Sequence, residues 1–265
     1  MSWLQTILIA IVEGLTEFLP VSSTGHMIIT QSLLGMHSSE FLKAFTVIIQ
    51  LGAILSVVVL YWKRFFQSFD FYFKLFVACV PAGILGVLFN DYIDEVLESV
   101  VMVACMLVIG GVVMLFVDKW FVRNTKEDQP ITYKNAFLVG AFQCLAMLLP
   151  GVSRSMATIV GGMSRGLSRK QAAEFSFFLA VPTMAGASMV QLIKLLRTPE
   201  GMEALQSNLN ILIVGNVIAF VVALLAIKFF IGFVTKYGFK MFGWYRILVG
   251  GAILIALACG CNLSL

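Results

Sequence analysis

Glu13-Gly-Leu-Thr-Glu-Phe-Leu-Pro-Val-Ser-Ser-Thr-Gly-His26 is the stretch that decides how this chain folds. It combines carboxylates, hydroxyls and a histidine within a largely apolar sequence. Glu13 and Glu17 are four residues apart, so a helix would place them on one face. Pro20 and the residues after it should break that helix. A second polar stretch, Pro150-Gly-Val-Ser-Arg-Ser-Met-Ala-Thr158, has the same character, and we expect the two stretches to meet in one site.

The composition is that of an integral membrane protein. Of the 265 residues 60% are hydrophobic and 12% charged, whereas soluble domains have about 25% charged residues. Mean hydropathy is +0.97. The net charge of +4 is too small to favour a nucleic-acid partner, and the basic residues lie near the ends of apolar runs. No Lys or Arg precedes Lys43, so we expect no cleaved signal peptide.

The apolar runs predict an all-α protein with six full transmembrane helices and two re-entrant helical hairpins. Each hairpin is a pair of short helices around a broken segment, which is tolerated at membrane depth only inside protein or beside a wet cavity. The hairpins are predicted at 3–19 with 24–35, and at 131–149 with a helix to about Gly166. The full spans are predicted at 41–62, 71–90, 100–118, 172–194, 209–231 and 244–261.

The two halves of the chain resemble each other. Leu19-Pro20 and Leu149-Pro150 are 130 residues apart, as are Ser23 and Ser153. Within a single membrane domain, 1–265, we therefore expect repeat one at about 1–118, a cytoplasmic link at about 119–130, and repeat two at about 131–265. Each repeat holds three full spans, so the second should be inverted relative to the first, with the site where they meet.

Lys and Arg predict the orientation. They gather in the links after the first, third and fifth spans and at the end of the second hairpin, whereas the link at 91–99 is acidic. Arg246 is counted here as part of the link after the fifth span. The basic side should be cytoplasmic. Both termini and the site would then face the outer, periplasmic side.

Ionisable residues at membrane depth point to function, because burying them is costly. The candidates are Glu13, Glu17, His26, Arg154 and Glu174. Glu13 and Glu17 could form a buried structural pair with Arg154. Two carboxylates paired with one guanidinium leave one net negative charge, however, and a divalent cation would neutralise that charge.

Both broken segments offer anion-binding groups at a helix start. Arg154 can make a planar, bidentate phosphate contact, and backbone N–H groups at a helix N-terminus also bind anions. The candidate hydroxyls are Ser22, Ser23, Thr24, Ser153, Ser155 and Thr158. Helix capping is the alternative explanation for each hydroxyl. His26 is either structural or a proton-transfer group. A cation, an anion cradle and a nucleophile or base are the requirements of phosphoryl transfer.

These motifs resemble those of the BacA-type undecaprenyl pyrophosphate phosphatases. Glu13-x-x-x-Glu17, Pro-Val-Ser-Ser-Thr-Gly-His26 and Pro150-Gly-x-Ser-Arg-Ser-x-x-Thr158 carry the resemblance, which runs along the whole chain. It implies a multi-pass protein of the bacterial inner membrane that removes the terminal phosphate of undecaprenyl pyrophosphate and recycles the carrier for peptidoglycan synthesis. It also implies Mg²⁺ or Ca²⁺ dependence and bacitracin resistance.

The resemblance further implies roles for individual residues. Glu13 and Glu17 would bind metal, and Glu17 would also be catalytic. Ser23 would be the nucleophile or its helper, and His26 would assist proton transfer. The remaining motif residues would hold the phosphates: Ser22, Thr24, Ser153, Arg154, Ser155 and Thr158. Arg154 among them would also be catalytic.

Several alternatives stay open at this point. Water or Ser23 could attack the phosphorus, and either metal could serve. The chain could instead transport undecaprenyl phosphate across the membrane, alone or in addition to hydrolysis. A purely structural membrane protein would not explain the buried ionisable residues. The sequence also leaves the oligomeric state open, a homodimer included.

Overall fold

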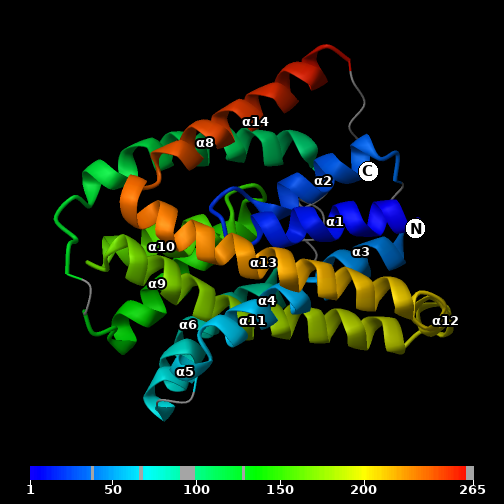
Figure 1. The fold of residues 1–265 in the computed structure, drawn as a ribbon, viewed down its shortest axis with the longest axis horizontal. Coiled ribbons are helices and arrows are strands. Elements are labelled where there is room, and N and C mark those ends of the chain that lie inside the picture. The colour runs from blue at the N-terminus through cyan, green and yellow to red at the C-terminus, as the bar shows by residue number, and fades with distance from the viewer. Residues whose placement is uncertain (37–38, 66–67, 90–98, 127–128, 261–265) are drawn as a thin grey trace.

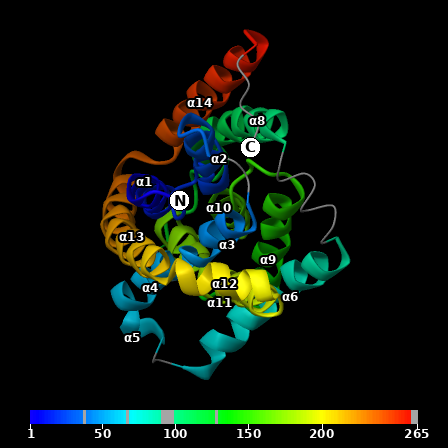
Figure 2. The ribbon, with the colours of Figure 1, turned by 90° about the vertical axis from the view of Figure 1, so that its right-hand side faces the viewer.

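The computed structural model describes residues 1–36, 39–65, 68–89, 99–126 and 129–260. His37, which follows the first predicted hairpin and which the sequence predicts to be a loop residue, lies outside these ranges, as does most of the acidic link at 91–99. The described residues fold entirely into helices and connecting turns (Figures 1 and 2). The helices of the first half are α1 (Trp3–Thr16), α2 (Ser23–Leu33), α3 (Glu40–Ile48), α4 (Gln50–Leu60), α5 (Trp62–Phe65), α6 (Phe69–Leu88) and α8 (Val100–Trp120).

The second half follows with a similar order of short and long helices. Its helices are α9 (Tyr133–Leu148), α10 (Arg154–Ser164), α11 (Arg169–Leu196), α12 (Pro199–Ser207), α13 (Leu209–Tyr237) and α14 (Lys240–Ala258). The short helix α12 was not predicted. It begins with Thr198 as N-cap and a proline in its first turn, a strong local start signal.

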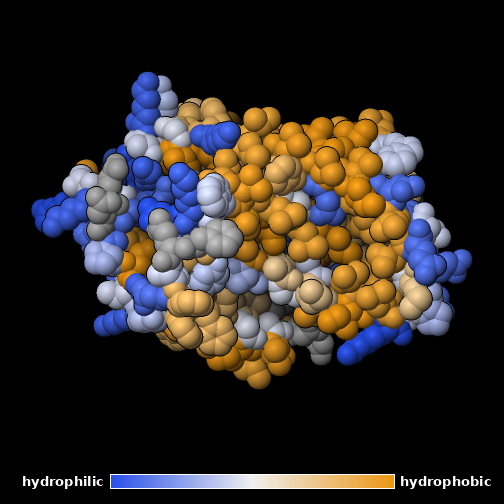
Figure 3. All heavy atoms as spheres, turned by 60° about the horizontal axis from the view of Figure 1, so that its bottom comes forward, coloured by the Kyte–Doolittle hydropathy of each residue, from blue (hydrophilic) through white to orange (hydrophobic). Residues whose placement is uncertain are grey.

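Among the residues that the structure describes, six segments are long and apolar enough to cross a membrane: α3 with α4, then α6, α8, α11, α13 and α14. This confirms the six predicted spans and makes the chain a multi-pass membrane protein. Figure 3 shows a face whose middle is covered by hydrophobic residues, while hydrophilic residues gather toward the two ends of the long axis. That arrangement suits an apolar bilayer core between two polar surfaces.

The first helix ends earlier than predicted, at Thr16 instead of beside Pro20. A proline ring crowds the carbonyl four residues before it, here that of Thr16, and offers no N–H to it, which favours an end of the helix before Pro20. Residues 17–21 form a turn in its place. The early end turns Glu17 into the C-cap and places its side chain at the start of the broken segment.

Glycines bring several of the helices into close contact. A Cβ atom on Gly140 of α9 would lie 1.9 Å from the carbonyl oxygen of Ala78 on α6. On α8, a Cβ on Gly111 would lie 2.8 Å from the carbonyl oxygen of Gly243 on α14. Small residues of this kind let helix backbones approach closely inside a membrane, where packing replaces the hydrophobic effect between helices.

The two broken segments have matching backbones. Ser22 caps α2 and Ser153 caps α10, and both have positive φ angles, 72° and 76°. Each Oγ accepts a hydrogen bond from the backbone N–H three residues later. The predicted offset of 130 paired Ser23 with Ser153 and is wrong here. The two capping serines, Ser22 and Ser153, are 131 residues apart, because the second broken segment is one residue longer than the first.

Candidate active site

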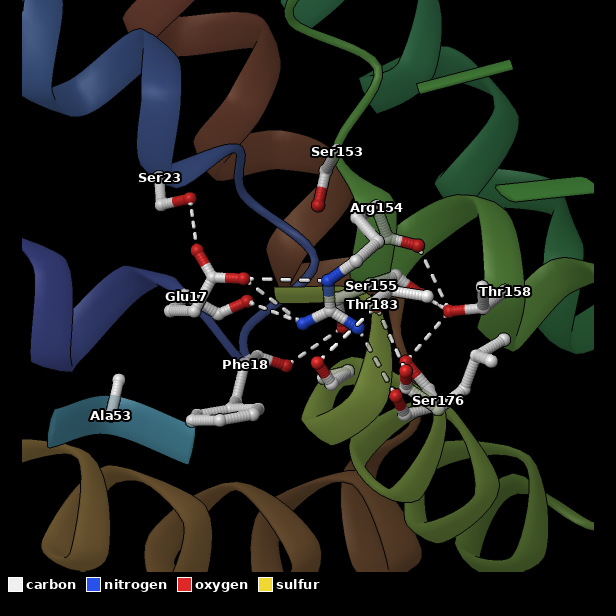
Figure 4. A network of polar contacts seen from close by, with 12 residues as sticks. Glu17, Phe18, Ser23, Ala53, Ser153, Arg154, Ser155, Thr158, Ser176 and Thr183 are labelled. Atoms are coloured by element: carbon white, nitrogen blue, oxygen red, sulfur yellow. Dashed lines mark hydrogen bonds and ion pairs between the residues drawn. The ribbon is translucent and has the colours of Figure 1, made fainter. Parts of the chain in front are cut away.

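The two broken segments meet at the centre of the molecule, between α1 and α2 on one side and α9 and α10 on the other (Figures 1 and 4). Ser155 Oγ donates a hydrogen bond to the carbonyl oxygen of Phe18 over 2.8 Å, and both residues are fully buried. The predicted meeting of the two polar stretches is therefore observed.

Glu17 is the central acceptor of this site. Its Oε1 lies 3.0 Å from Arg154 Nη2, and its Oε2 accepts a 2.5 Å hydrogen bond from Ser23 Oγ. Only 6% of the Glu17 side chain and 15% of the Arg154 side chain are exposed. Little water therefore screens the ion pair, and the guanidinium holds the Glu17 carboxylate in position beside the Ser23 hydroxyl (Figure 4).

Arg154 reaches from the first residue of α10 to two other elements. Its Nη1 donates to the carbonyl oxygen of Ser176 on α11 over 3.1 Å, and its guanidinium carbon lies 6.0 Å from the centre of the Phe18 ring. Glu17 and Ser176 take four of the five guanidinium N–H groups, so among the described residues one is left for an anion. Sequence reasoning assigned no site role to Ser176, because a backbone acceptor leaves no sequence signal.

Glu13 lies one turn before Glu17 and is fully buried. Neither of its carboxylate oxygens has a hydrogen-bond partner in the part of the chain that the structure describes. A buried carboxylate without partners is costly, so either a proton or a bound cation must compensate the charge of Glu13. Two neighbouring carboxylates fit a hard divalent cation such as Mg²⁺, which binds one or two carboxylates together with substrate phosphates.

The other predicted phosphate-binding hydroxyls differ in their surroundings. Thr158 is fully buried and hydrogen-bonds to the carbonyl oxygens of Arg154 and Ser155 and, over 2.7 Å, to Ser176 Oγ. Ser22 and Ser153 serve as helix caps, and Ser155 joins the two broken segments. Half-buried Thr24 lies in the first turn of α2, next to Ser23.

His26 is not hydrogen-bonded to the two acids. Its Nδ1 lies 2.8 Å from the carbonyl oxygen of Ser22, and its Nε2 lies 2.7 Å from the hydroxyl oxygen of Tyr245 on α14. Glu174, the remaining ionisable candidate, is half-buried on α11.

Arg246 corrects one prediction. We had counted it among the residues of a cytoplasmic link, but it lies inside α14 and is fully buried. Its guanidinium donates to the carbonyl oxygens of Pro20 and Gly151, one in each broken segment, and to that of Met106 on α8. Arg246 was counted with the link because it lay at the very start of the span predicted at 244–261; α14 begins at Lys240, which places Arg246 almost two turns within the helix.

Fold and site together define a polytopic helical membrane protein with a buried, charged site between two broken helix pairs. The chain matches the family model described as bacitracin resistance protein BacA over residues 6–252 and belongs to this family. Similar full-length proteins are named undecaprenyl-diphosphatase. They include one from Porphyromonas gingivalis (strain W83), 56% identical with 100% of both chains covered, and one from Flavobacterium johnsoniae, 59% identical with 96% of both covered. Another, from Bdellovibrio bacteriovorus, is 52% identical with 100% of both covered.

Proposed function

We propose that this protein hydrolyses undecaprenyl diphosphate to undecaprenyl phosphate and inorganic phosphate, and so recycles the lipid carrier for cell-wall synthesis. Full-length relatives that are 52–59% identical to this chain are named undecaprenyl-diphosphatase. The observation in the structure that carries the proposal is the contact of Ser23, Glu17 and Arg154, which joins a hydroxyl, a carboxylate and a guanidinium in one buried site.

The geometry favours Ser23 over water as the attacking group. A nucleophile held within hydrogen-bond distance of a base that is itself oriented by a third group is the usual arrangement for covalent catalysis. Ser23 Oγ attacks the terminal phosphorus as its proton passes to Glu17 Oε2. The bond from that phosphorus to the bridging oxygen breaks, and undecaprenyl phosphate leaves. Water then cleaves the phosphoserine ester and releases phosphate.

Arg154 stabilises the negative charge of the transferring phosphoryl group, which is the main catalytic requirement of this chemistry. A divalent cation, Mg²⁺ or Ca²⁺, would be held by Glu13 and Glu17 and would neutralise phosphate charge when bound. The unpartnered oxygens of Glu13 support this assignment.

The direct test is phosphate release from undecaprenyl diphosphate by the detergent-purified protein, with Mg²⁺, with Ca²⁺ and with EDTA. We expect release that requires a divalent cation and is lost in Arg154→Ala. Mass spectrometry of acid-quenched samples should find phosphate on Ser23, and near-normal turnover by Ser23→Ala would exclude the covalent route. If the wild-type protein releases no phosphate under any of these conditions, that result would contradict the proposal and favour lipid transport.

The same proposal includes two re-entrant hairpins in inverted repeats. At about 1.5 Å per residue, the 14 residues of α1 extend about 21 Å, and the apolar core of a bilayer is about 30 Å thick. The helix contacts are also alike when each helix is replaced by its counterpart in the other half, α1 by α9, α4 by α11 and α6 by α13. The contact of α1 with α13 then corresponds to that of α9 with α6, and the contact of α4 with α13 to that of α11 with α6. In Figure 1, α1 starts from the right end and α9 from the left.

The basic residues support a cytoplasmic location for the link between the halves, with both termini and the site toward the periplasm. Single cysteines test this orientation. In a cysteine-free variant, Ser2→Cys should react with a membrane-impermeant maleimide in intact cells, whereas Lys126→Cys should react only after lysis. Labelling of Lys126→Cys in intact cells would contradict the orientation.

A further inference from the structure

Tyr245 and His26 form a close pair that the proposed mechanism does not use. The hydroxyl oxygen of Tyr245 lies 2.7 Å from His26 Nε2, and the two rings are stacked with centroids 5.5 Å apart and planes 7° from parallel. His26 lies in the first turn of α2, and Tyr245 lies on α14, 219 residues later in the chain. The pair therefore ties the start of α2 to a distant helix.

The backbone determines which ring nitrogen of His26 carries the proton. His26 Nδ1 lies 2.8 Å from the carbonyl oxygen of Ser22, and a carbonyl oxygen only accepts hydrogen bonds. Nδ1 must therefore be the protonated nitrogen. In the neutral ring Nε2 is then an acceptor, and the Tyr245 hydroxyl donates to it.

The Tyr245 hydroxyl suits both charge states of the ring. It donates to the neutral imidazole and can rotate to accept from Nε2–H when His26 takes up a proton. Tyr245 is 43% exposed, whereas Arg246, the next residue, is fully buried. Neighbouring residues of α14 thus have different partners: Arg246 binds the two broken segments, and Tyr245 binds His26 at the start of α2.

We infer that Tyr245 is a positioning residue: its hydroxyl donates to Nε2 of the Nδ1-protonated His26 and holds the ring in its observed orientation. The inference rests on the proposed function for its catalytic consequence, which is the assistance in proton transfer that the family resemblance implies for His26. The hydrogen-bonding arrangement itself is independent of activity and can be measured without substrate.

The first experiment is ¹⁵N NMR of histidine-labelled protein in a His37→Gln background, purified without a histidine tag, so that His26 is the only histidine. We expect a protonated Nδ1 and a hydrogen-bonded, unprotonated Nε2. Tyr245→Phe should move the Nε2 resonance toward that of a free acceptor, while the Ser22 carbonyl keeps the proton on Nδ1. Tyr237→Phe is the matched control, because Tyr237 is an exposed tyrosine on α13. The spectrum of this variant should equal that of the His37→Gln protein.

The second experiment is a double-mutant cycle in phosphate release. Tyr245→Phe should lower kcat about tenfold, the effect of losing one hydrogen bond of ordinary strength, with little change in KM. In a His26→Gln background the same change should have no further effect, because residues that act through each other are not additive.

Each outcome decides a different claim. An unchanged Nε2 resonance in Tyr245→Phe, or an equal loss of kcat in both backgrounds, would overturn the role of Tyr245. Full activity of His26→Gln would remove the catalytic role of His26 and with it that of Tyr245. If the wild-type protein releases no phosphate, the proposed function fails, and the NMR result alone decides whether Tyr245 donates a hydrogen bond to Nε2 of His26.

Discussion

At the scale of single residues, the contact of Ser23 with Glu17 makes the sharpest prediction. Glu17→Gln removes the base and the partner of Arg154 while keeping the size of the side chain. We expect turnover to fall by at least about 100-fold, the usual contribution of a general base. The measurement is phosphate release from undecaprenyl diphosphate at saturating metal.

Glu200→Gln is the matched control, because Glu200 is an exposed acid on the short helix α12. It should leave turnover unchanged. Full turnover in Glu17→Gln would show that Glu17 is not the base. Size-exclusion chromatography accompanies the assay, because a Glu17→Gln protein that no longer elutes as a single species would have lost its fold.

The sequence predicted those site residues whose side chains are unusual at membrane depth. Glu17, Ser23 and Arg154 were all expected in one site, and the structure brings them into contact. The contribution of Ser176 could not be predicted, since Arg154 binds its backbone oxygen. Tyr245 also escaped prediction, because a tyrosine near a helix start is ordinary in a membrane protein.

At the scale of elements, Arg246 connects both broken segments to α14 and α8. Arg246→Met leaves three carbonyl oxygens, those of Pro20, Met106 and Gly151, without this donor. An unsatisfied buried polar group costs about 1–3 kcal/mol, so the thermal unfolding midpoint in detergent should fall by several degrees. Arg197→Met, at the exposed end of α11, is the control and should unfold like the wild type.

The close contact of α9 with α6 gives a second prediction at this scale. Gly140→Ala would place a methyl group against the Ala78 carbonyl and should destabilise the protein by about 1–3 kcal/mol through overpacking. Gly186→Ala, on α11, meets nothing within 4 Å and should be neutral or slightly stabilising. Equal unfolding midpoints for the two variants would contradict the packing described for α9 and α6.

At the scale of the whole molecule, hydropathy predicted the six long segments because each must be apolar along its length to lie in a bilayer. Segment ends were less predictable. Pro20 signals that a helix ends but not at which of the preceding residues, and the apolar sequence around Arg246 does not show where α14 begins. Local turns and buried arginines are determined by tertiary contacts, which a single sequence does not reveal.

Asp118 joins distant parts of the molecule away from the site. Its Oδ1 accepts a 2.7 Å hydrogen bond from Arg169 Nε on α11, and its Oδ2 accepts a 2.8 Å bond from the backbone N–H of Phe239, just before α14. Asp118→Ala should lower stability by about 1–3 kcal/mol, measured by thermal unfolding, without altering KM. Glu203→Ala, on exposed α12, should change neither, and an unaffected Asp118→Ala would contradict a structural role for this contact.

The positive φ angles of Ser22 and Ser153 have a consequence for how such a protein can be improved. A serine in this conformation costs of order 1–3 kcal/mol, and glycine would remove that cost. Glycine would also remove the hydroxyl that fixes each helix start beside the site. Selection for heat resistance alone should therefore favour glycine at these positions and yield durable but slow variants. Selection for turnover should restore serine. The two serines therefore represent a balance between stability and turnover.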